Sequence, residues 1–401
     1  MAKDRIMILG AGVYQAPLIR KAAKMGLETV VVSPRGMYPG IPLADIYLDL
    51  DTTDETGVFH AAKKYAVSGI ATTGTDVCLP ALGKVTDGLG LAGPGHDAAR
   101  RSMDKSMMKQ ALSEHGVPAA EFGVFTSHEE AGAFAGAMGG PVMVKAADSS
   151  GSRGISRVDD PSGFRKAWEH ARASARSGRV IVERFLSGIE FGAQAFVHGG
   201  RNGESRVAAV FPHGDTVTPG PFLTPVGHCM PSPLTKTQEQ ETARVIQQAV
   251  HALGIADCVA NVDLMLVDGA PVIIEIGARM GATCIPEVLF VYTGIDAYEH
   301  VIRLALGEYP EIRETGKQPN ACLLLRSPAT GTVKDILIPD SVKGHPSVVE
   351  IQIDVKPGDA VKTFEVGPDR IGHLVVKAQT AAAAESLADE LASKIHFTIS
   401  P

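Results

Sequence analysis

The segment that most constrains the fold is residues 261–281, NVDLMLVDGAPVIIEIGARMG. Polar and apolar residues alternate on both sides of an Asp-Gly pair, the pattern of a β-hairpin with one buried face. The even positions are all apolar and predict the core face: Val262, Leu264, Leu266, Val272, Ile274 and Ile276. The odd face carries Asn261, Asp263, Glu275, Gly277 and Arg279. Asp263 and Glu275 can share that face only if the loop around Asp268-Gly269 contains an odd number of residues, such as three.

Asp263 and Glu275 are therefore predicted to be direct or diagonal cross-strand neighbours. Two carboxylates this close repel each other unless a cation lies between them. An all-oxygen pair favours Mg²⁺ completed by water and phosphate. The alternative is a hairpin whose acids only face solvent, because alternating polar faces are ordinary in antiparallel sheets.

A second informative segment runs from Pro141 to Gly154, where an apolar strand ends on Lys145 and continues into a glycine-rich loop. A buried lysine needs an anionic partner, and a phosphate would supply one. The loop offers backbone N–H groups, small hydroxyl side chains and a guanidinium, which together can fold over a polyphosphate. The chain has no Walker A motif, and an exposed turn is the alternative interpretation of this loop.

The first hundred residues alternate short apolar runs with amphipathic stretches, which predicts a parallel α/β sheet covered by helices. The turn at Gly10 to Gly12 resembles the start of a dinucleotide-binding motif. Gln15 stands at the third glycine position, however, and no acidic residue ends the second strand, so a tight turn is favoured over NAD binding. From about residue 320, short strands and one helix predict a smaller α+β unit.

Composition narrows the class of partner. The 401 residues carry a formal net charge of -7, which lacks the basic surplus typical of proteins that bind nucleic acid or anionic membranes. Five scattered cysteines without C-x-x-C spacing indicate reduced thiols and a cytoplasmic location. No secretory leader and no apolar run long enough to span a membrane are found in the sequence. A small-molecule substrate is the expected partner.

The chain contains an ordered set of motifs: Lys105 in MDKSMMKQAL, Lys145 in PVMVKAADSSGSRGI, the run Glu183, Arg184, Phe185, Leu186 with Glu190 after it, and then Asp263, Glu275 and Arg279. This set resembles the ATP-grasp superfamily. The resemblance spans essentially the whole chain. It implies an α/β and α+β fold with a Rossmann-like pre-ATP-grasp domain at 1–102, an ATP-grasp domain at 103–312 and a small α+β C-terminal domain at 313–401. A mobile lid subdomain would span about 118–187.

The resemblance also implies roles. Lys105 and Lys145 would contact the ATP phosphates under a mobile loop made of Ser150, Gly151, Ser152, Arg153 and Gly154. The backbone of Arg184 and Leu186 would bind adenine, with Glu183 and Phe185 in the same segment, and Glu190 would hold the ribose. Asp263 and Glu275 would bind Mg²⁺, or alternatively Mn²⁺, and Arg279 would act with Lys145 in catalysis. The family often has Asn two residues after the second metal carboxylate, where this chain has Gly277.

Substrate contacts are expected from Arg279 and from two further residues. Asp76 follows a strand of the first domain at its carboxyl end, where such sheets bind ligands. His228 is predicted to lie in a Pro-rich loop before a helix at 237–253, either as a turn-stabilising side chain or as a substrate contact.

The combined prediction is an ATP-dependent carboxylate–amine ligase that forms an acyl phosphate and releases ADP and phosphate. The E-I-G-A-R-M-G sequence resembles ligases of the amino-acid type, and dimeric relatives suggest a homodimer. Two alternatives remain open: a bicarbonate-activating carboxylase or carbamoyl-phosphate synthetase-like enzyme, and a nucleotide-binding regulator without activity.

Overall fold

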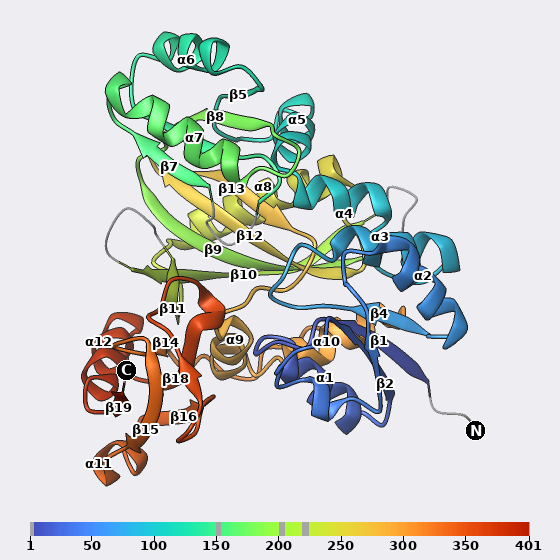
Figure 1. Cartoon of the computed structure of the whole chain (residues 1–401), viewed down its shortest axis with the longest axis vertical. Helices are drawn as coiled ribbons and strands as arrows, with labels where there is room; N and C mark the ends of the chain where they lie inside the picture. The colour runs from blue at the N-terminus through green and yellow to red at the C-terminus, as the bar shows by residue number, and fades with distance from the viewer. Residues whose placement is uncertain (1–3, 150–153, 200–204, 219–223, 401) are drawn as a thin grey trace.

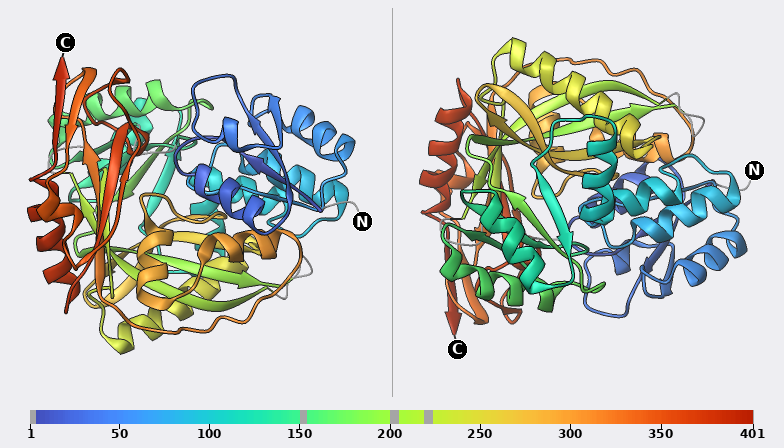
Figure 2. Two further views of the ribbon diagram at one scale, coloured as in Figure 1. Left: turned by 90° about the horizontal axis from the view of Figure 1, so that it is seen from below. Right: turned by 90° about the horizontal axis from the view of Figure 1, so that it is seen from above.

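The computed structural model describes residues 4–149, 154–199, 205–218 and 224–400, which form the four sheets shown in Figure 1. The two ends of the chain lie on opposite sides of the molecule (Figure 2). Residues 150–153, which include the expected loop residues Ser150, Gly151, Ser152 and Arg153, lie outside the described residues. Within the described parts of the chain, every helix is too short or too polar to cross a membrane.

The N-terminal part is a four-stranded parallel sheet in the order β3-β2-β1-β4, which confirms the prediction of parallel pairing. Its strands are β1 (Arg5–Leu9), β2 (Glu28–Ser33), β3 (Ile46–Asp49) and β4 (Gly69–Ala71). Its helices are α1 (Ala16–Lys24), η1 (Ile41–Leu43), α2 (Glu55–Lys64), α3 (Leu79–Leu89) and α4 (His96–Met103). At the glycine turn, the Gly12 N–H donates to Gln15 Oε1 at 2.9 Å, so the Gln15 side chain takes up a donor that a dinucleotide motif leaves for phosphate.

After α5 (Lys105–Glu114) comes a small antiparallel sheet in the order β5-β8-β6-β7. Its strands are β5 (Phe122–Phe125), β6 (Val142–Ala146), β7 (Ile155–Val158) and β8 (Val180–Arg184), and its helices are α6 (His128–Ala137), η2 (Pro161–Gly163) and α7 (Phe164–Ser174). Apolar side chains of both longer helices, including Trp168, pack on the sheet as a separate core. The small sheet stands above the central sheet in Figure 1.

The central sheet has eight strands in the order β13-β12-β9-β10-β11-β14-β18-β16. They are β9 (Ile189–His198), β10 (Arg206–Val217), β11 (Pro225–Met230), β12 (Cys258–Val267), β13 (Ala270–Gly277), β14 (Asn320–Arg326), β16 (Val348–Ile353) and β18 (Arg370–Lys377). The helices of this part are α8 (Lys236–Leu253), α9 (Ile285–Thr293) and α10 (Ala297–Ala305). Because β14 pairs with β11, the sheet continues across the boundary expected near residue 312.

A three-stranded sheet, β17-β15-β19, completes the C-terminal part. It consists of β15 (Gly331–Leu337), β17 (Ala360–Val361) and β19 (His396–Ser400), accompanied by α11 (Asp340–Lys343), η3 (Gly367–Asp369) and α12 (Ala381–Ala392). Leu391 and other apolar residues of α12 pack with β14 and β18 into one core. This part is the α+β unit expected after residue 320.

The two faces of the central sheet differ in polarity. Odd residues of β9, such as Phe191 and Val197, join α5 and α8 in one core. The even residue Phe196 joins a second core that contains α1, α9 and α10. The same face continues into a run of polar side chains near the middle of the sheet, namely Glu190, Gln194, His213, Asp215, Asn261, Asp263 and Glu275.

The hairpin prediction was right about the pairing of the two acids and wrong about the loop that allows it. Asp263 and Glu275 are direct cross-strand partners, as expected. The loop, however, has only two residues, Asp268 and Gly269, both with positive φ (49° and 83°), and a bulge at Ile274 restores the parity. Between the bulge and the turn the faces are therefore exchanged: Ile273 is fully buried, whereas Val272 and Ile274 are only partly buried.

The position predicted for His228 was also wrong. The residue lies in β11, between β10 and β14, and not in a loop. Its neighbours Val226 and Met230 are buried, as is His228 itself at 4% exposure. Ladder pairing on both sides and burial on both faces outweigh the turn preference of the flanking prolines, because Pro225 occupies the first position of the strand, where its missing N–H is tolerated. The expected helix at 237–253 is confirmed as α8.

Candidate functional site

A cavity of about 700 Å³ lies over the polar face of the central sheet, between that sheet, the N-terminal part and the C-terminal part. Seven residues singled out from the sequence line this one cavity: Asp76, Lys105, Glu190, His228, Asp263, Glu275 and Arg279. They come from strands and loops that are up to about two hundred residues apart in the chain. The fold therefore brings together most of the residues that the motifs singled out.

Asp263 and Glu275 form the centre of the site. Lys105 begins α5 and is 6% exposed, and its Nζ donates to Glu275 Oε1 at 2.9 Å and to the Ser149 carbonyl at 2.8 Å. Burial is the largest single influence and lowers the pKa of Lys105, but the charge and hydrogen bond of Glu275, together with the charges of Asp76 and Glu183, raise the pKa above its ordinary value. Glu275 thus has a cationic partner in Lys105.

Asp263 has no such cationic partner among the residues that the structure describes. Its Oδ1 accepts a neutral hydrogen bond from Asn261 Nδ2 at 3.0 Å. Burial, followed by repulsion from Glu275, raises the pKa of Asp263 to about 7, and the more distant Arg279 offsets this only in part. A buried carboxyl group with such a pKa can bind either a proton or a metal cation near neutral pH.

Lys145 lies outside the cavity lining, in β6 of the small sheet. It forms an ion pair with Glu183, and Lys109 forms a second ion pair with the same carboxylate at 3.0 Å. Burial would raise the pKa of Glu183, but the two lysines outweigh burial and hold it at about 2. The two ammonium groups thus share one carboxylate, which leaves a net positive charge available to an anion.

Arg279 is held by Asp76 of the N-terminal part. Its Nη2 donates to Asp76 Oδ2 at 2.8 Å, and its Nε lies 2.8 Å from Oδ1 without a well-aligned hydrogen bond. Gly277 makes this pairing feasible, because a Cβ at position 277 would lie 2.9 Å from Asp76 Oδ1. The position where the family often has Asn is therefore next to a carboxylate from another part of the chain.

The segment expected to bind adenine follows β8 directly. The Arg184 N–H donates to the Glu121 carbonyl at 2.9 Å and the Phe185 N–H to the Pro141 carbonyl at 3.0 Å. Leu186 is partly buried in the same segment, and Glu190 lies at the start of β9 on the cavity wall. Gly154, with a φ of +69°, begins the return into β7, and its carbonyl accepts from the Ala146 N–H.

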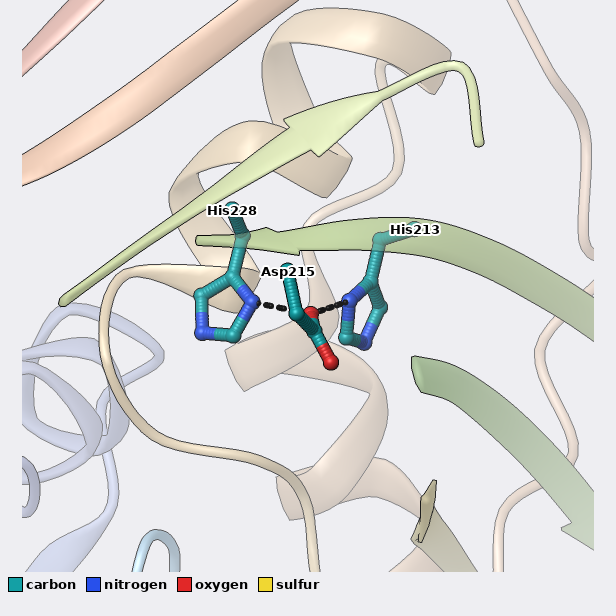
Figure 3. Close-up of side chains that lie close together, drawn as sticks. All are labelled: His213, Asp215 and His228. Atoms are coloured by element: carbon teal, nitrogen blue, oxygen red, sulfur yellow. Dashed lines mark hydrogen bonds and ion pairs between the residues drawn. The ribbon is translucent and has the colours of Figure 1, made fainter. Parts of the chain in front are cut away.

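Two residues were missed at the sequence level, the buried His213 and the partly buried Asp215. In β10 they point the same way as His228 of β11, and the Asp215 carboxylate lies between the two imidazoles (Figure 3). Gly192 of β9 lies opposite His213, and a Cβ there would lie 2.1 Å from the imidazole Cε1. The i, i+2 spacing of His213 and Asp215 in FPHGDTV was a usable signal, since such residues share one face of a strand.

A relay of side chains connects these residues with the acid pair. Gln194 contacts His213 Nε2 at 3.3 Å and donates to Asn261 Oδ1 at 2.7 Å. Asn261 in turn donates to Asp263. Gln194 Oε1 accepts from the Gly281 N–H at 2.9 Å, which fixes the amide orientation. The polar face is therefore a connected network and not a set of separate groups.

The matching families identify the class. Residues 103–284 match the phosphoribosylglycinamide synthetase ATP-grasp (A) domain family, and residues 323–400 match the L-amino acid ligase C-terminal domain 2 family. The chain is thus an ATP-grasp protein and an ATP-dependent ligase, as the motifs predicted.

Individual relatives and solved structures cover between 69% and 100% of this chain. The phosphoribosylamine–glycine ligase of Allochromatium vinosum is 28% identical over 303 residues, which are 69% of this chain and 68% of that protein. The crystal structure of phosphoribosylglycinamide synthetase from Anaerococcus prevotii is similar over 100% of both chains, with a TM-score of 0.82 and 28% identity. The L-amino acid ligase from Bacillus licheniformis shares the fold over 100% of both chains, with a TM-score of 0.80 and 20% identity.

Proposed function

We propose that the protein is a carboxylate–amine ligase. It would activate a small carboxylate as an acyl phosphate with ATP, join the acyl group to an amine, and release ADP and phosphate. The observation that carries this proposal is the single cavity that joins the paired acids Asp263 and Glu275 to Lys105 and Arg279. Phosphoryl transfer requires mainly positioning and charge neutralisation, and these side chains offer both.

The acid pair fits a magnesium ion. Both carboxylates project from neighbouring positions of one sheet face, and the pKa of Asp263, raised to about 7 by burial and by Glu275, reflects a shortage of positive charge there. An all-oxygen donor set is the set that Mg²⁺ prefers, and Mn²⁺ would be accepted as well. When bound, the ion would neutralise the phosphate oxygens during transfer.

The lysines fit a triphosphate. Lys105 reaches the acid pair from α5, whereas Lys145 and Lys109 share the single charge of Glu183. Lys105 and Lys145 would bind the phosphates, the Glu183-to-Leu186 segment the adenine, and Glu190 the ribose. Arg279 would stabilise the charge that develops on the acyl phosphate, with Asp76 holding its guanidinium in place.

An amino acid is the proposed carboxylate. The match of residues 323–400 to an L-amino acid ligase domain supports this substrate class, because η3 and the loop before it contribute Glu365 and Pro368 to the cavity wall. The relatives named as phosphoribosylamine–glycine ligases support the same reaction type, in which an amino acid carboxylate meets an amine.

The test is a screen of amino acids and small carboxylates, singly and in pairs, for Mg²⁺-dependent phosphate release, with mass spectrometry of the product. An amide product is expected, and Asp263→Asn should abolish it. The matched control is Asp268→Asn in the exposed turn of the same hairpin, which should remain active. Phosphate release that depends on bicarbonate alone would identify a carboxylase instead, and tight ATP binding without turnover would identify a regulator.

A further inference from the structure

The buried His213 and His228 and the partly buried Asp215 form a cluster on the wall of the cavity (Figure 3). The reaction as proposed above gives this cluster no task. Asp215 Oδ1 lies 2.8 Å from His213 Nδ1 and 2.6 Å from His228 Nδ1. Burial would raise the pKa of Asp215, but the two imidazoles outweigh burial and hold it well below its usual range. The carboxylate is therefore ionised and can only accept hydrogen bonds.

The ionised Asp215 carboxylate determines which ring nitrogen of each histidine carries a proton. Each ring must carry a proton on Nδ1 in order to donate to Asp215, so in its neutral form each ring has a lone pair on Nε2. Burial lowers the pKa of His228, although the Asp215 charge acts in the other direction, and this favours the neutral form. His213 Nε2 faces the Gln194 amide at 3.3 Å. His228 Nε2 is buried and has no hydrogen-bond partner among the described residues, although His228 is part of the cavity wall. A buried acceptor without a partner is costly, which points to a donor supplied by a ligand.

The charges around the cavity indicate what kind of donor fits. Among the described residues that line it, six are carboxylates and three are lysine or arginine: Asp76, Glu190, Asp215, Asp263, Glu275 and Glu365 against Lys105, Arg279 and Lys362. Lys105 and Arg279 are already engaged with Glu275 and Asp76. With Asp263 and Glu275 assigned to Mg²⁺, the other four carboxylates still outnumber the three cations, and one of them, Asp215, contacts His228 directly. This favours a cationic donor, and a primary ammonium group combines positive charge with hydrogen-bond donors.

We propose that His228 Nε2 is the general base that activates the amine substrate, with Asp215 and His213 as positioning residues. This inference rests on the proposed ligase function and deepens it by naming the site for the nucleophile. The arrangement, a carboxylate that fixes the tautomer of a histidine whose other nitrogen meets the reacting group, is an established way to place a base.

The proton and electron balance is as follows. The substrate ammonium transfers one proton to His228 Nε2, and the imidazolium is stabilised by Asp215. The freed amine lone pair forms the carbon–nitrogen bond at the acyl phosphate carbon, and the bond between that carbon and the phosphate oxygen breaks. The remaining excess proton on nitrogen leaves with the phosphate as hydrogen phosphate. His228 then returns its proton to solvent.

The experiment compares His228→Gln with wild type for two nucleophiles. A mixture of L-amino acids serves as both carboxylate and amine in one assay, and hydroxylamine, which is already neutral near pH 7, replaces the amine in the other. His228→Gln should lower amide formation about a hundredfold or more. The same variant should largely retain hydroxamate formation, which is detected as the coloured iron(III) complex, because neutral hydroxylamine needs no base. Equal losses with both nucleophiles, or no loss with either, would overturn the proposal.

Two further variants separate chemistry from folding. Asp215→Asn should also favour hydroxylamine over amino acids, because it removes the charge that fixes the His228 tautomer. His300→Gln is the matched control: His300 is also buried, its Nε2 also lacks a partner among the described residues, and it lies outside the cavity lining. It should leave both activities unchanged. Thermal melting of each variant checks that it folds.

The tautomer can also be measured without turnover. The nitrogen chemical shifts of ¹⁵N-labelled histidine in the wild-type protein report it, and the spectrum of His228→Gln identifies which signals belong to His228. The neutral tautomer protonated on Nδ1 is expected for His228, and the tautomer protonated on Nε2 would overturn the proposal. A further outcome is the expected tautomer in a wild-type protein that forms neither amide nor hydroxamate. That result would contradict the proposed ligase function but not the hydrogen-bond geometry of Asp215 and His228. A zinc ion retained by wild type and lost in His228→Gln would make the cluster a metal site instead.

Discussion

Metal binding at Asp263 should compete with a proton. With a pKa of about 7, the metal-free carboxyl group is about one-tenth ionised near pH 6 and about nine-tenths ionised near pH 8. Since a metal binds the ionised form, the affinity for Mg²⁺ should rise about tenfold over that interval and level off above it. Near pH 7, binding should release about half a proton per ion.

Calorimetric titration of the nucleotide-free protein with Mg²⁺ or Mn²⁺ in two buffers of different ionisation enthalpy measures both quantities. Asp263→Asn should remove the pH dependence together with most of the affinity, whereas Asp268→Asn should change neither. An affinity that stays constant between about pH 6 and pH 8 would refute the reasoning, because it would show that no ligand titrates there.

The same shift has a consequence for stability, with a defined sign. The folded-state pKa of Asp263 lies above its ordinary value of 3.8, so the folded protein holds a proton that the unfolded chain has lost. The metal-free protein should therefore lose stability as the pH rises from about 4 to about 7. Mg²⁺ should offset this loss, and the increase in melting temperature on adding Mg²⁺ should be larger near pH 8 than near pH 6.

Three further variants test other contacts. Arg279→Ala should lower kcat about a hundredfold while weakening ATP binding much less, because Arg279 would stabilise mainly the transition state. Near-normal turnover would show that Arg279 is only a structural partner of Asp76. Lys145→Ala should weaken ATP binding by about tenfold or more, as measured by calorimetry, because the ATP phosphates that Lys145 would bind are already charged in the ground state. Unchanged affinity would show that Lys145 does not belong to the nucleotide site. Gly277→Ala should lower both turnover and melting temperature, because its Cβ displaces the Asp76 carboxylate from Arg279; unchanged values would show that Asp76 moves at no cost.

The acid pair could be predicted from sequence because a strand has a strict period of two, so polar residues at alternate positions must share a face. The way in which Asp263 and Glu275 come to face each other could not. The pair Asp268-Gly269 is a strong signal for a two-residue turn, which by itself would have placed the two acids on opposite faces. The bulge at Ile274 corrects this, and the apolar run VII at 272–274 carries no sign of where a bulge falls.

Pairings between distant segments were the least predictable. Asp76 and Arg279 were each expected to contact substrate, yet they contact each other, and the space that allows this comes from Gly277. The prolines around His228 suggested a loop, because local turn preference is visible in sequence whereas pairing with β10 and β14 is not. The domain boundaries and the site roles inferred from the family resemblance stay predictions.

The most direct test of the ligase proposal follows the oxygen atoms. If the carboxylate attacks the terminal phosphate of ATP and the amine then displaces that phosphate from the acyl group, one carboxylate oxygen must leave with the phosphate. An amino acid substrate labelled with ¹⁸O in its carboxylate, once the screen has found one, should therefore yield phosphate that carries one ¹⁸O atom per turnover, as read by mass spectrometry. Phosphate without the label, formed together with the amide product, would contradict an acyl phosphate intermediate.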